Sequence, residues 1–274
     1  MAKKKQIESE EKEMTFWEHL EELRWHIVRS VLAVLVLAVI AFLNRRILFD
    51  EIILGPSTSS FVTNKILCRI GEILSIDGIC MDSLKLQIIN INMSGQFMMH
   101  LYISMVTGAI LAFPFILNEV WSFIRPALHS KESSYSRRAV IISSLLFFVG
   151  VLFSYFLIVP LTVNFLGTYQ VSQAVTNQIS IDSYVNTVVS VTFAIGIVFE
   201  LPLIIYFLTK LGLVTPAFLK RNRKYMLVIL LIISAIITPP DVFSQILVCI
   251  PLMGLYELSI MVADRIYKKE QLNN

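Results

Sequence analysis

The chain has 274 residues, of which 56% are hydrophobic and 16% are charged, and its mean hydropathy is +0.72. A soluble domain of this size carries about 25% charged residues, so the composition excludes an ordinary water-soluble fold. The net charge of +3 is small, and we expect no nucleic-acid partner. Apolar residues occur in long blocks, which indicates a polytopic membrane protein.

The N-terminal segment divides into a polar part and an amphipathic part. Residues 1–13 are highly charged, with neither an apolar stretch nor a cleavage site of the kind found in signal peptides, and they predict a solvated, disordered tail. In the next stretch, Met14 to Arg29, apolar residues recur at helical spacing. This pattern predicts an amphipathic helix that lies at the membrane surface and leads into the first span.

Six apolar runs predict an all-α protein with six transmembrane helices. Pro114 predicts a kink in the second run. The fifth run is only about 21 Å long as a helix, whereas the hydrocarbon core is about 30 Å thick. Local thinning of the bilayer would accommodate the short fifth helix and the proline-interrupted sixth, and a re-entrant hairpin is the alternative. We expect one domain with a concave face at 14–266, a tail at 267–274, and spans at about 27–43, 97–117, 139–159, 185–208, 225–238 and 242–263.

The distribution of Lys and Arg between the loops predicts the orientation. The N-terminal region, the loops at 118–138 and 210–224, and the C-terminal tail are rich in basic residues, whereas the loop at 161–184 has none. Short cytoplasmic loops carry an excess of Lys and Arg. Both termini are therefore predicted to be cytoplasmic.

The cysteines agree with this orientation. Cys68 and Cys80 lie in the predicted first outside loop. In an oxidising compartment they could form a disulfide bond, and the alternative is that both are small apolar residues packed under a loop. Cys249 lies in a span, where we expect it to serve packing.

Glu200 is the most unusual residue of the apolar runs. It lies inside the fourth run, where a charge costs about 2.5 to 3.5 kcal/mol on insertion scales. Such residues usually face away from lipid and serve a function. The alternative is a protonated side chain that is hydrogen-bonded to a neighbouring helix, which is compatible with a functional role. Asp241 and Gln245, at the start of the sixth run, are candidate polar partners.

A second set of acids lies at the predicted cytoplasmic ends of the spans. Acids beside basic residues usually form solvated ion pairs worth at most about 1 kcal/mol. A more specific hypothesis is that these acids bind a cationic peptide with adjacent arginines, because two separated carboxylates can each bind one guanidinium bidentately. The acids in question are Glu18, Glu21, Glu22, Glu119 and Glu132.

Signals of catalysis are weak in this sequence. The four histidines are scattered, and neither HExxH, GxSxG, a P-loop nor a Gly-rich dinucleotide fingerprint occurs. We therefore expect no enzymatic activity, no metal and no cofactor.

Several motifs, in order along the chain, resemble those of the TatC component of the twin-arginine protein translocase. HLEELRWHIV at 19–28 resembles the HLxELRxR element of that family, and FPFILNEVWSFIRPALHSKE at 113–132 resembles its FPxxxYQxWxFxxPGLxxxE signature. VFELP at 198–202 and TPPDVFSQ at 238–245 resemble two further signatures. The resemblance covers about residues 14 to 266 and has the same six spans and cytoplasmic termini.

The resemblance implies roles for individual positions. Glu22 and Glu132 match carboxylates that bind the arginine pair of the signal peptide, and Glu200 matches an intramembrane glutamate. Asp241 and Gln245 match a polar pair at the last turn. The remaining matches are Arg24 in the first element, Phe123 and Pro126 in the first inside loop, and Pro56 in the first outside loop.

The chain departs from the family pattern at three places in these elements, one of which is Ala127, where glycine is usual. His26 replaces the usual second arginine of ELRxR, which predicts sensitivity of that site to pH near about 6.5. Asn118 and Glu119 stand where Tyr-Gln is usual.

The resemblance implies a receptor and core subunit for exporting folded proteins across the bacterial cytoplasmic (inner) membrane with the proton-motive force. The expected partners are twin-arginine signal peptides, single-span subunits of the TatA or TatB type, lipid, and further copies of the chain. Two rival hypotheses stay open. One is a proton-coupled small-molecule transporter with Glu200 as the proton carrier, and the other is a structural scaffold in which Glu22 and Glu132 are dispensable.

Overall fold

The computed structural model describes residues 16–58, 60–74, 87–124, 136–172, 177–238 and 242–273. The predicted tail at 1–13 and the predicted site residues Cys80, Pro126, Glu132 and Asp241 lie outside these ranges. The first half of the chain forms α1 (Phe16–Leu43), a π-helix (Arg46–Ile53), a 3₁₀ turn (Gly55–Ser57), α2 (Val62–Leu74), β1 (Gln87–Ile89) and α3 (Gly95–Ile124). The second half forms α4 (Ser136–Phe153), a π-helix (Ser154–Ile158), α5 (Val159–Thr168), β2 (Gln178–Ser180), α6 (Ile181–Val198), α7 (Leu201–Lys210), α8 (Pro216–Arg221), α9 (Arg223–Ile237) and α10 (Val242–Asn273).

The predicted all-α membrane architecture is confirmed, but the count of six spans is not. Five helical stretches in the described part of the chain are long and apolar enough to cross a membrane. α9 has 15 residues, which corresponds to about 22 Å, so it falls short of the hydrocarbon thickness. The five stretches are His19–Leu43, Gly95–Phe123, Ala139–Thr168, Ile181–Lys210 and Ser244–Lys268.

Three helices end elsewhere than the sequence patterns predict. The third run was expected to stop before Pro160, yet the helix continues through a π-helical turn into α5, because a proline is tolerated in the first turn of a helix. The fourth run is divided between α6 and α7 at Phe199 and Glu200. α10 remains helical to Asn273, through most of the segment for which a tail was predicted.

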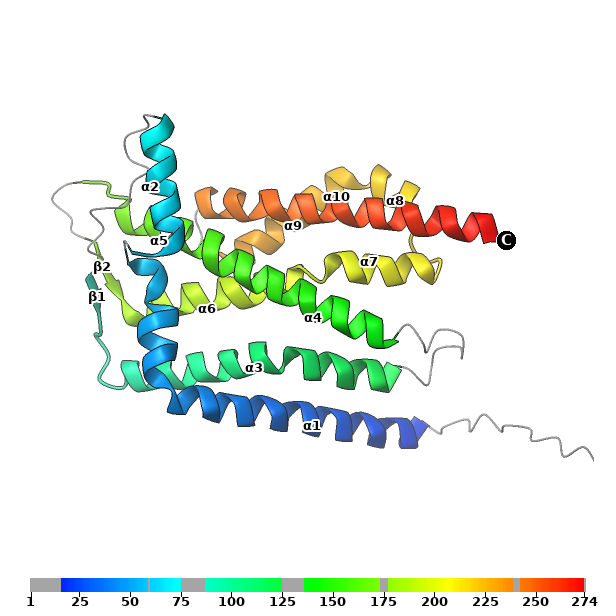
Figure 1. Ribbon diagram of the computed structural model, residues 1–274, viewed down its shortest axis with the longest axis horizontal. Helices are drawn as coiled ribbons and strands as arrows, with labels where there is room; N and C mark the ends of the chain where they lie inside the picture. Colours follow the sequence, from blue (N-terminus) through cyan, green and yellow to red (C-terminus); the bar gives the residue numbers. More distant parts are fainter. Residues whose placement is uncertain are drawn as a thin grey trace, which may run out of the picture.

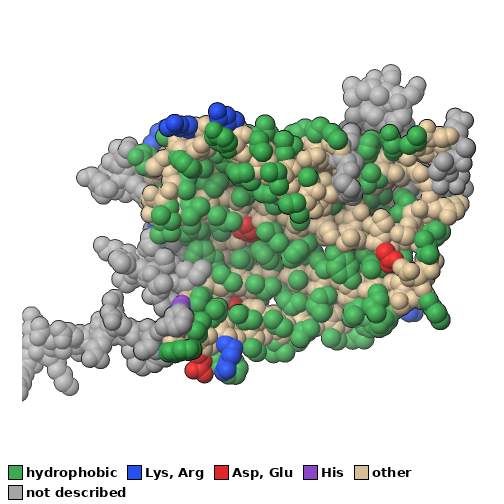
Figure 2. All heavy atoms as spheres, turned by 180° about the vertical axis from the view of Figure 1, so that it is seen from behind, with side chains coloured by type: hydrophobic (Ala, Val, Ile, Leu, Met, Phe, Trp, Pro, Cys, Tyr) green, Lys and Arg blue, Asp and Glu red, His purple; other side chains and the backbone are tan. Residues whose placement is uncertain are grey.

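The long helices run side by side, and the molecule has two distinct ends (Figure 1). One end holds the start of α1, the end of α3, the start of α4 and the C-terminus, whereas α2 and the β1–β2 pair cover the other end. On the face drawn in Figure 2, hydrophobic side chains cover the middle and most charged side chains lie toward the two ends. This distribution fits a protein whose middle contacts lipid.

Small residues let neighbouring helices approach closely. A Cβ at Gly108 of α3 would lie 2.7 Å from the backbone of Val34 and Ala38 in α1. A Cβ at Gly150 of α4 would lie 3.1 Å from the Cα of Gly196 in α6. Close backbone approach at small residues is the usual basis of helix packing in membranes.

The segment between α1 and α3 folds over the end of the bundle. β1 pairs in parallel with β2, with Gln87 opposite Gln178. The hydroxyls of Tyr155 and Tyr184 donate to the carbonyls of Ile52 and Ile53, each at 2.8 Å. These bonds fasten the loop to α6 and to the π-helical turn that follows α4.

Pro56 belongs to this same segment. It lies buried in the first turn of the 3₁₀ helix that follows Leu54. Its carbonyl accepts a hydrogen bond from Nδ2 of Asn64 at 3.4 Å, and the same amide donates to the carbonyl of Thr58 at 2.8 Å. These contacts tie the turn to the start of α2 and fit a structural role for Pro56.

Candidate functional site

α1 and α3 bring four titratable side chains together at the end of the molecule where α1 begins and α3 ends (Figure 1). Glu22, His26 and Arg29 are spaced by four and three residues, which places them on one face of α1. Glu119 approaches this face from near the end of α3. We call these four residues the α1–α3 charged cluster.

His26 lies between the two carboxylates of the cluster. Its Nδ1 is 2.6 Å from Oε2 of Glu119, and its Nε2 is 4.0 Å from Oε1 of Glu22. Nη1 of Arg29 lies 3.8 Å from the same oxygen of Glu119. The side chains of His26 and Glu119 are only 12% and 10% exposed, so solvent screens their contact much less than that of a surface pair.

Glu22 is the least satisfied member of the cluster. Its side chain is 35% exposed, yet its Oε2 is buried and has no hydrogen-bond partner among the residues that the structure describes. An ionised carboxylate offers about four acceptor positions. A buried oxygen without a donor carries its desolvation cost uncompensated, so Glu22 has unused capacity to accept from a ligand.

The aromatic ring of Phe123 covers one side of the cluster. It stacks on His19 with ring centroids 4.3 Å apart, and it meets His26 edge-on at 6.1 Å. Arg24 is directed elsewhere: it lies 3.6 Å from Glu21 and over the ring of Trp25, and its side chain is 65% exposed. The structure therefore joins Phe123 to Glu22 through His26 and leaves Arg24 outside the cluster.

Glu200 lies at an interruption of the fourth span. Pro202 in the first turn of α7 has no N–H to donate, so the hydrogen-bond ladder breaks between α6 and α7. The side chain of Glu200 is buried, and Oγ of Ser143 in α4 donates to its Oε2 at 2.5 Å. Its Oε1 is buried without a hydrogen-bond partner within the described ranges. This geometry matches the expected bond to a neighbouring helix.

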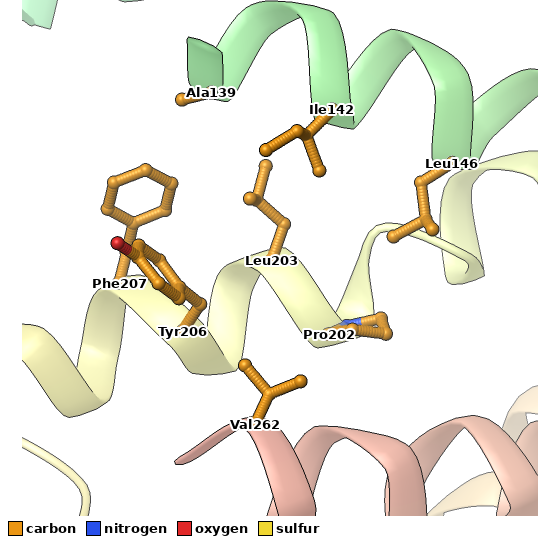
Figure 3. A pocket seen from close by; sticks show the side chains of 8 residues that line it. All are labelled: Ala139, Ile142, Leu146, Pro202, Leu203, Tyr206, Phe207 and Val262. Atoms are coloured by element: carbon orange, nitrogen blue, oxygen red, sulfur yellow. The ribbon is translucent and has the colours of Figure 1, made fainter. Parts of the chain in front are cut away.

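An apolar cavity of about 420 Å³ lies close to Glu200, between α4, α7 and α10. In Figure 3, Ile142 and Leu203 point toward one another from α4 and α7, and Val262 reaches toward them from α10. Pro202 lies two residues after Glu200, and Ile142 precedes Ser143, so the cavity and the buried acid share the same two helices.

Gln245 makes its hydrogen bond to a different helix from Glu200. Nε2 of Gln245 donates to the carbonyl of Leu231 at 3.0 Å, which ties α10 to α9. Asp241 lies outside the described residues. Pro114 sits inside α3, where its missing N–H leaves the carbonyl of Ile110 without its helical donor.

Two of the three cysteines, Cys68 and Cys249, lie among the described residues. Cys68 is disulfide-bonded, Cys249 is a buried free thiol, and the pairing of Cys68 with Cys80 stays a prediction because Cys80 is not among the described residues. Within the described ranges, no group of three or more His, Cys, Asp or Glu side chains is arranged to hold a metal.

Comparison with known proteins decides the family. Residues 18–251 match the family described as Sec-independent protein translocase protein (TatC). The chain belongs to the TatC family. It is 39% identical to the Sec-independent protein translocase protein TatC of Blattabacterium sp. subsp. Periplaneta americana, over 96% of this chain and 100% of that protein. It is 35% identical to the TatC of Aquifex aeolicus, over 94% of this chain and 98% of that protein.

Solved structures agree with this assignment. The crystal structure of the twin-arginine translocase receptor TatC in DDM matches with a TM-score of 0.73 and 36% identity, over 90% of this chain and 99% of that one. A second crystal structure of the same receptor matches with a TM-score of 0.71 and 35% identity, over 90% of this chain and 98% of that one. The chain is therefore a TatC-type component of Sec-independent protein translocation, and a small-molecule transporter is not supported.

Sequence patterns missed two contacts of this TatC-family chain. His26 and Glu119 were each recognised as departures from the family pattern, but only the structure shows that they contact one another. Ser143 was not predicted as a site residue. The sequence does contain a signal for it, because the Ser143-Ser144 pair interrupts an otherwise apolar run. Contacts between residues 93 or 57 positions apart depend on helix packing that periodicity does not determine.

Proposed function

We propose that this TatC-family chain binds twin-arginine signal peptides at Glu22 and Glu132 and takes part in the export of folded proteins across the cytoplasmic membrane. The observation that carries the proposal is the buried Oε2 of Glu22, which has no hydrogen-bond partner among the described residues. A guanidinium is planar and donates two parallel hydrogen bonds to one carboxylate. Two adjacent arginines therefore call for two carboxylates, of which Glu132 is the second.

Phe123 and Pro126 are proposed to border the same binding site. The ring of Phe123 already stacks on His19 and meets His26 edge-on, so it forms an apolar wall beside Glu22. Such a wall excludes water and strengthens the charged hydrogen bonds next to it. Arg24 is exposed and paired with Glu21, and we assign it to the rim of the site.

Glu200 is proposed to contact a small single-span partner of the TatA or TatB type. Its Oε1, which has no hydrogen-bond partner among the described residues, and the adjacent apolar cavity together offer one polar acceptor within an apolar surface. A buried polar group in a membrane gains most from a partner that brings a donor. Asp241 and Gln245 belong to the same proposed contact region, and further copies of the chain complete the translocase.

The proposed orientation has both termini in the cytoplasm, in the inner membrane. Exposed basic side chains support it, because Lys220 and Lys268 both contact Asp264 in the last part of α10 and Arg24 lies in the first part of α1. The start of α1 and the C-terminus lie at the same end of the molecule (Figure 1). Short cytoplasmic loops carry an excess of such residues. The proton-motive force is the proposed energy source.

Binding of a signal peptide tests the recognition part. The probe is a synthetic peptide with an arginine pair, and the protein is the full chain in detergent. We expect Glu22→Ala and Glu132→Ala each to weaken binding by about tenfold or more, as loss of a charged hydrogen bond does. Glu21→Ala is the matched control, because Glu21 is 68% exposed and, among the described residues, forms an ion pair only with Arg24. Unchanged affinity in both site variants would remove the proposal.

Export itself tests the role of Glu200. We expect Glu200→Gln to lower export of a twin-arginine cargo while leaving peptide affinity intact, because the two sites lie on different helices. Normal export by this variant would show that the ionised form of Glu200 is unnecessary.

A further inference from the structure

The His26–Glu119 contact lies beside Glu22, but the function proposed above assigns it no part. Both ring nitrogens of His26 face a carboxylate, Nδ1 that of Glu119 at 2.6 Å and Nε2 that of Glu22 at 4.0 Å. A neutral imidazole has one N–H and donates at one nitrogen only. Only the protonated ring presents an N–H to both carboxylates at once.

We propose that the His26–Glu119 pair sets how strongly Glu22 binds a guanidinium. Glu119 is a positioning residue that holds the imidazole against Glu22, and protonated His26 competes with the ligand's guanidinium for the Glu22 carboxylate. This inference rests on the function proposed above, because it takes an arginine side chain as the ligand of Glu22.

The groups that face His26 come from both helices packed around it. From α1 they are Glu22 and Arg29, and from α3 they are Glu119 and the ring of Phe123. Arg29 also approaches Glu119, but its side chain is 60% exposed and its distance is 3.8 Å, against 2.6 Å for His26. His26 is therefore the basic side chain that lies closest to Glu119 in the cluster.

The direction of the pH effect follows from this geometry. Imidazole is the side chain whose charge changes between about pH 5 and pH 8. At the higher pH the neutral ring keeps its N–H on Glu119 and turns a lone pair toward Glu22, so Glu22 lacks a donor among the described residues and gains more from an incoming guanidinium. At the lower pH the protonated ring lies 4.0 Å from Oε1 of Glu22 and offsets part of its negative charge, so an incoming guanidinium gains less. Peptide binding therefore releases a proton and tightens as pH rises.

The test measures peptide affinity against pH. The probe is a capped arginine-pair peptide without histidine or acidic residues, and the protein is the full chain in detergent. We expect the wild type to bind about tenfold more tightly at pH 8 than near pH 5.5. This change corresponds to the release of one proton on binding over about one pH unit. His26→Gln removes the competing cation, so its affinity stays high and independent of pH. His26→Arg keeps a permanent cation, so its affinity is independent of pH.

Glu119→Gln tests the positioning role. The glutamine still accepts from Nδ1 of His26, but it removes the negative charge that favours the protonated ring. We expect the midpoint of the pH profile to move to lower pH. An unmoved midpoint would overturn the role of Glu119.

Three controls separate this effect from general changes. Glu21→Gln removes an acid one residue from Glu22 whose side chain is 68% exposed, and it should keep the wild-type pH profile. His19→Gln removes the other histidine beside Phe123, and the pH slope should survive whatever its effect on affinity. A peptide with glutamines in place of the arginines should show no such slope.

The outcomes distinguish this inference from the proposed function. A wild-type slope that persists in His26→Gln overturns the inference, even while binding still depends on Glu22 and on the peptide's arginines. Binding that depends on neither Glu22 nor the arginines overturns the proposed function itself. If His26→Gln does not fold, His26→Arg decides, because it retains a cation for Glu119: a flat profile supports the inference and an unchanged slope overturns it.

Discussion

Two buried acids hold helices together in this molecule, and they do so in opposite surroundings. Glu119 lies near the end of α3 with His26 at 2.6 Å and Arg29 at 3.8 Å, so two basic side chains of α1 face it. Glu200 lies within the membrane-spanning stretch, where its partner is the neutral hydroxyl of Ser143. Each carboxylate bridges two helices, but only the first is balanced by charge.

The difference shows how each acid is stabilised. A buried carboxylate needs a cation or several donors to offset its desolvation. Glu119 has a histidine and an arginine beside it, and both come from α1. Glu200 has one donor, the hydroxyl of Ser143, and its Oε1 has no hydrogen-bond partner among the described residues. The following changes test this contrast, starting with the largest expected effect.

Gly108→Val should have the largest effect, because it pushes α1 away from α3. A Cβ at this position would lie 2.7 Å from the backbone of Val34 and Ala38, and backbone cannot move aside without separating the helices. We expect a loss of about 3 kcal/mol or more in the free energy of unfolding, at the upper end of overpacking costs. An SDS titration in mixed micelles measures it.

Gly254→Val is the matched control for this substitution. It introduces the same side chain into α10, where a Cβ at Gly254 meets nothing within 4 Å. Its unfolding free energy should stay near that of the wild type. Equal losses in the two variants would show that valine itself, and not the α1–α3 approach, is responsible.

Glu119→Ala should rank next, at about 3 kcal/mol, which is the low end of the cost of breaking a buried ion pair. The same titration measures it, with Glu21→Ala as the control at about 0 to 1 kcal/mol, since the Glu21–Arg24 pair is exposed. A Glu119→Ala variant as stable as the control would show that Glu119 does not stabilise the packing of α1 against α3.

The sequence predicts the two acids but not their contrasting partners. Glu200 stands out because it interrupts an apolar run, and Glu22 and Glu119 stand out because they lie in recognisable elements. Their partners lie on other helices and depend on how those helices cross. The approach of Gly108 to α1 fixes one crossing and that of Gly150 to Gly196 fixes another, and neither distance is encoded in local periodicity.

The ends of the helices were the least predictable part of the fold. Hydropathy follows side chains, whereas the break at Glu200 results from the backbone donor that Pro202 lacks. Conversely, Pro160 was expected to stop a helix, but it lies in the first turn of α5, where no helical donor is needed. The fifth apolar run was recognised as short, and the helix there has 15 residues.

Ser143→Ala tests the other side of the contrast and should have a moderate effect. It removes the hydrogen bond that Glu200 accepts at 2.5 Å and leaves the whole carboxyl group unsatisfied within the described structure. We expect a loss of about 1 to 3 kcal/mol in unfolding free energy, the usual cost of an unsatisfied buried group. Ser144→Ala is the matched control, because the Ser144 hydroxyl donates to Val140 within its own helix. Similar losses in both variants would contradict a special role for the Ser143–Glu200 bond.

Gln245→Leu should have the smallest effect of the series. Its amide makes a single bond, at 3.0 Å, to the carbonyl of Leu231, and leucine fills a similar volume with an apolar side chain. A net hydrogen bond contributes about 1 kcal/mol, and the carbonyl of Leu231 retains the hydroxyl of Ser234 as a donor at 2.9 Å. We therefore expect the unfolding free energy to fall by about 1 kcal/mol or less. A larger loss would mean that the Gln245–Leu231 bond stabilises the packing of α9 on α10 as much as the Ser143–Glu200 bond stabilises that of α4 on α7. The comparison would then distinguish only contacts between ionisable groups, such as His26–Glu119, from neutral ones.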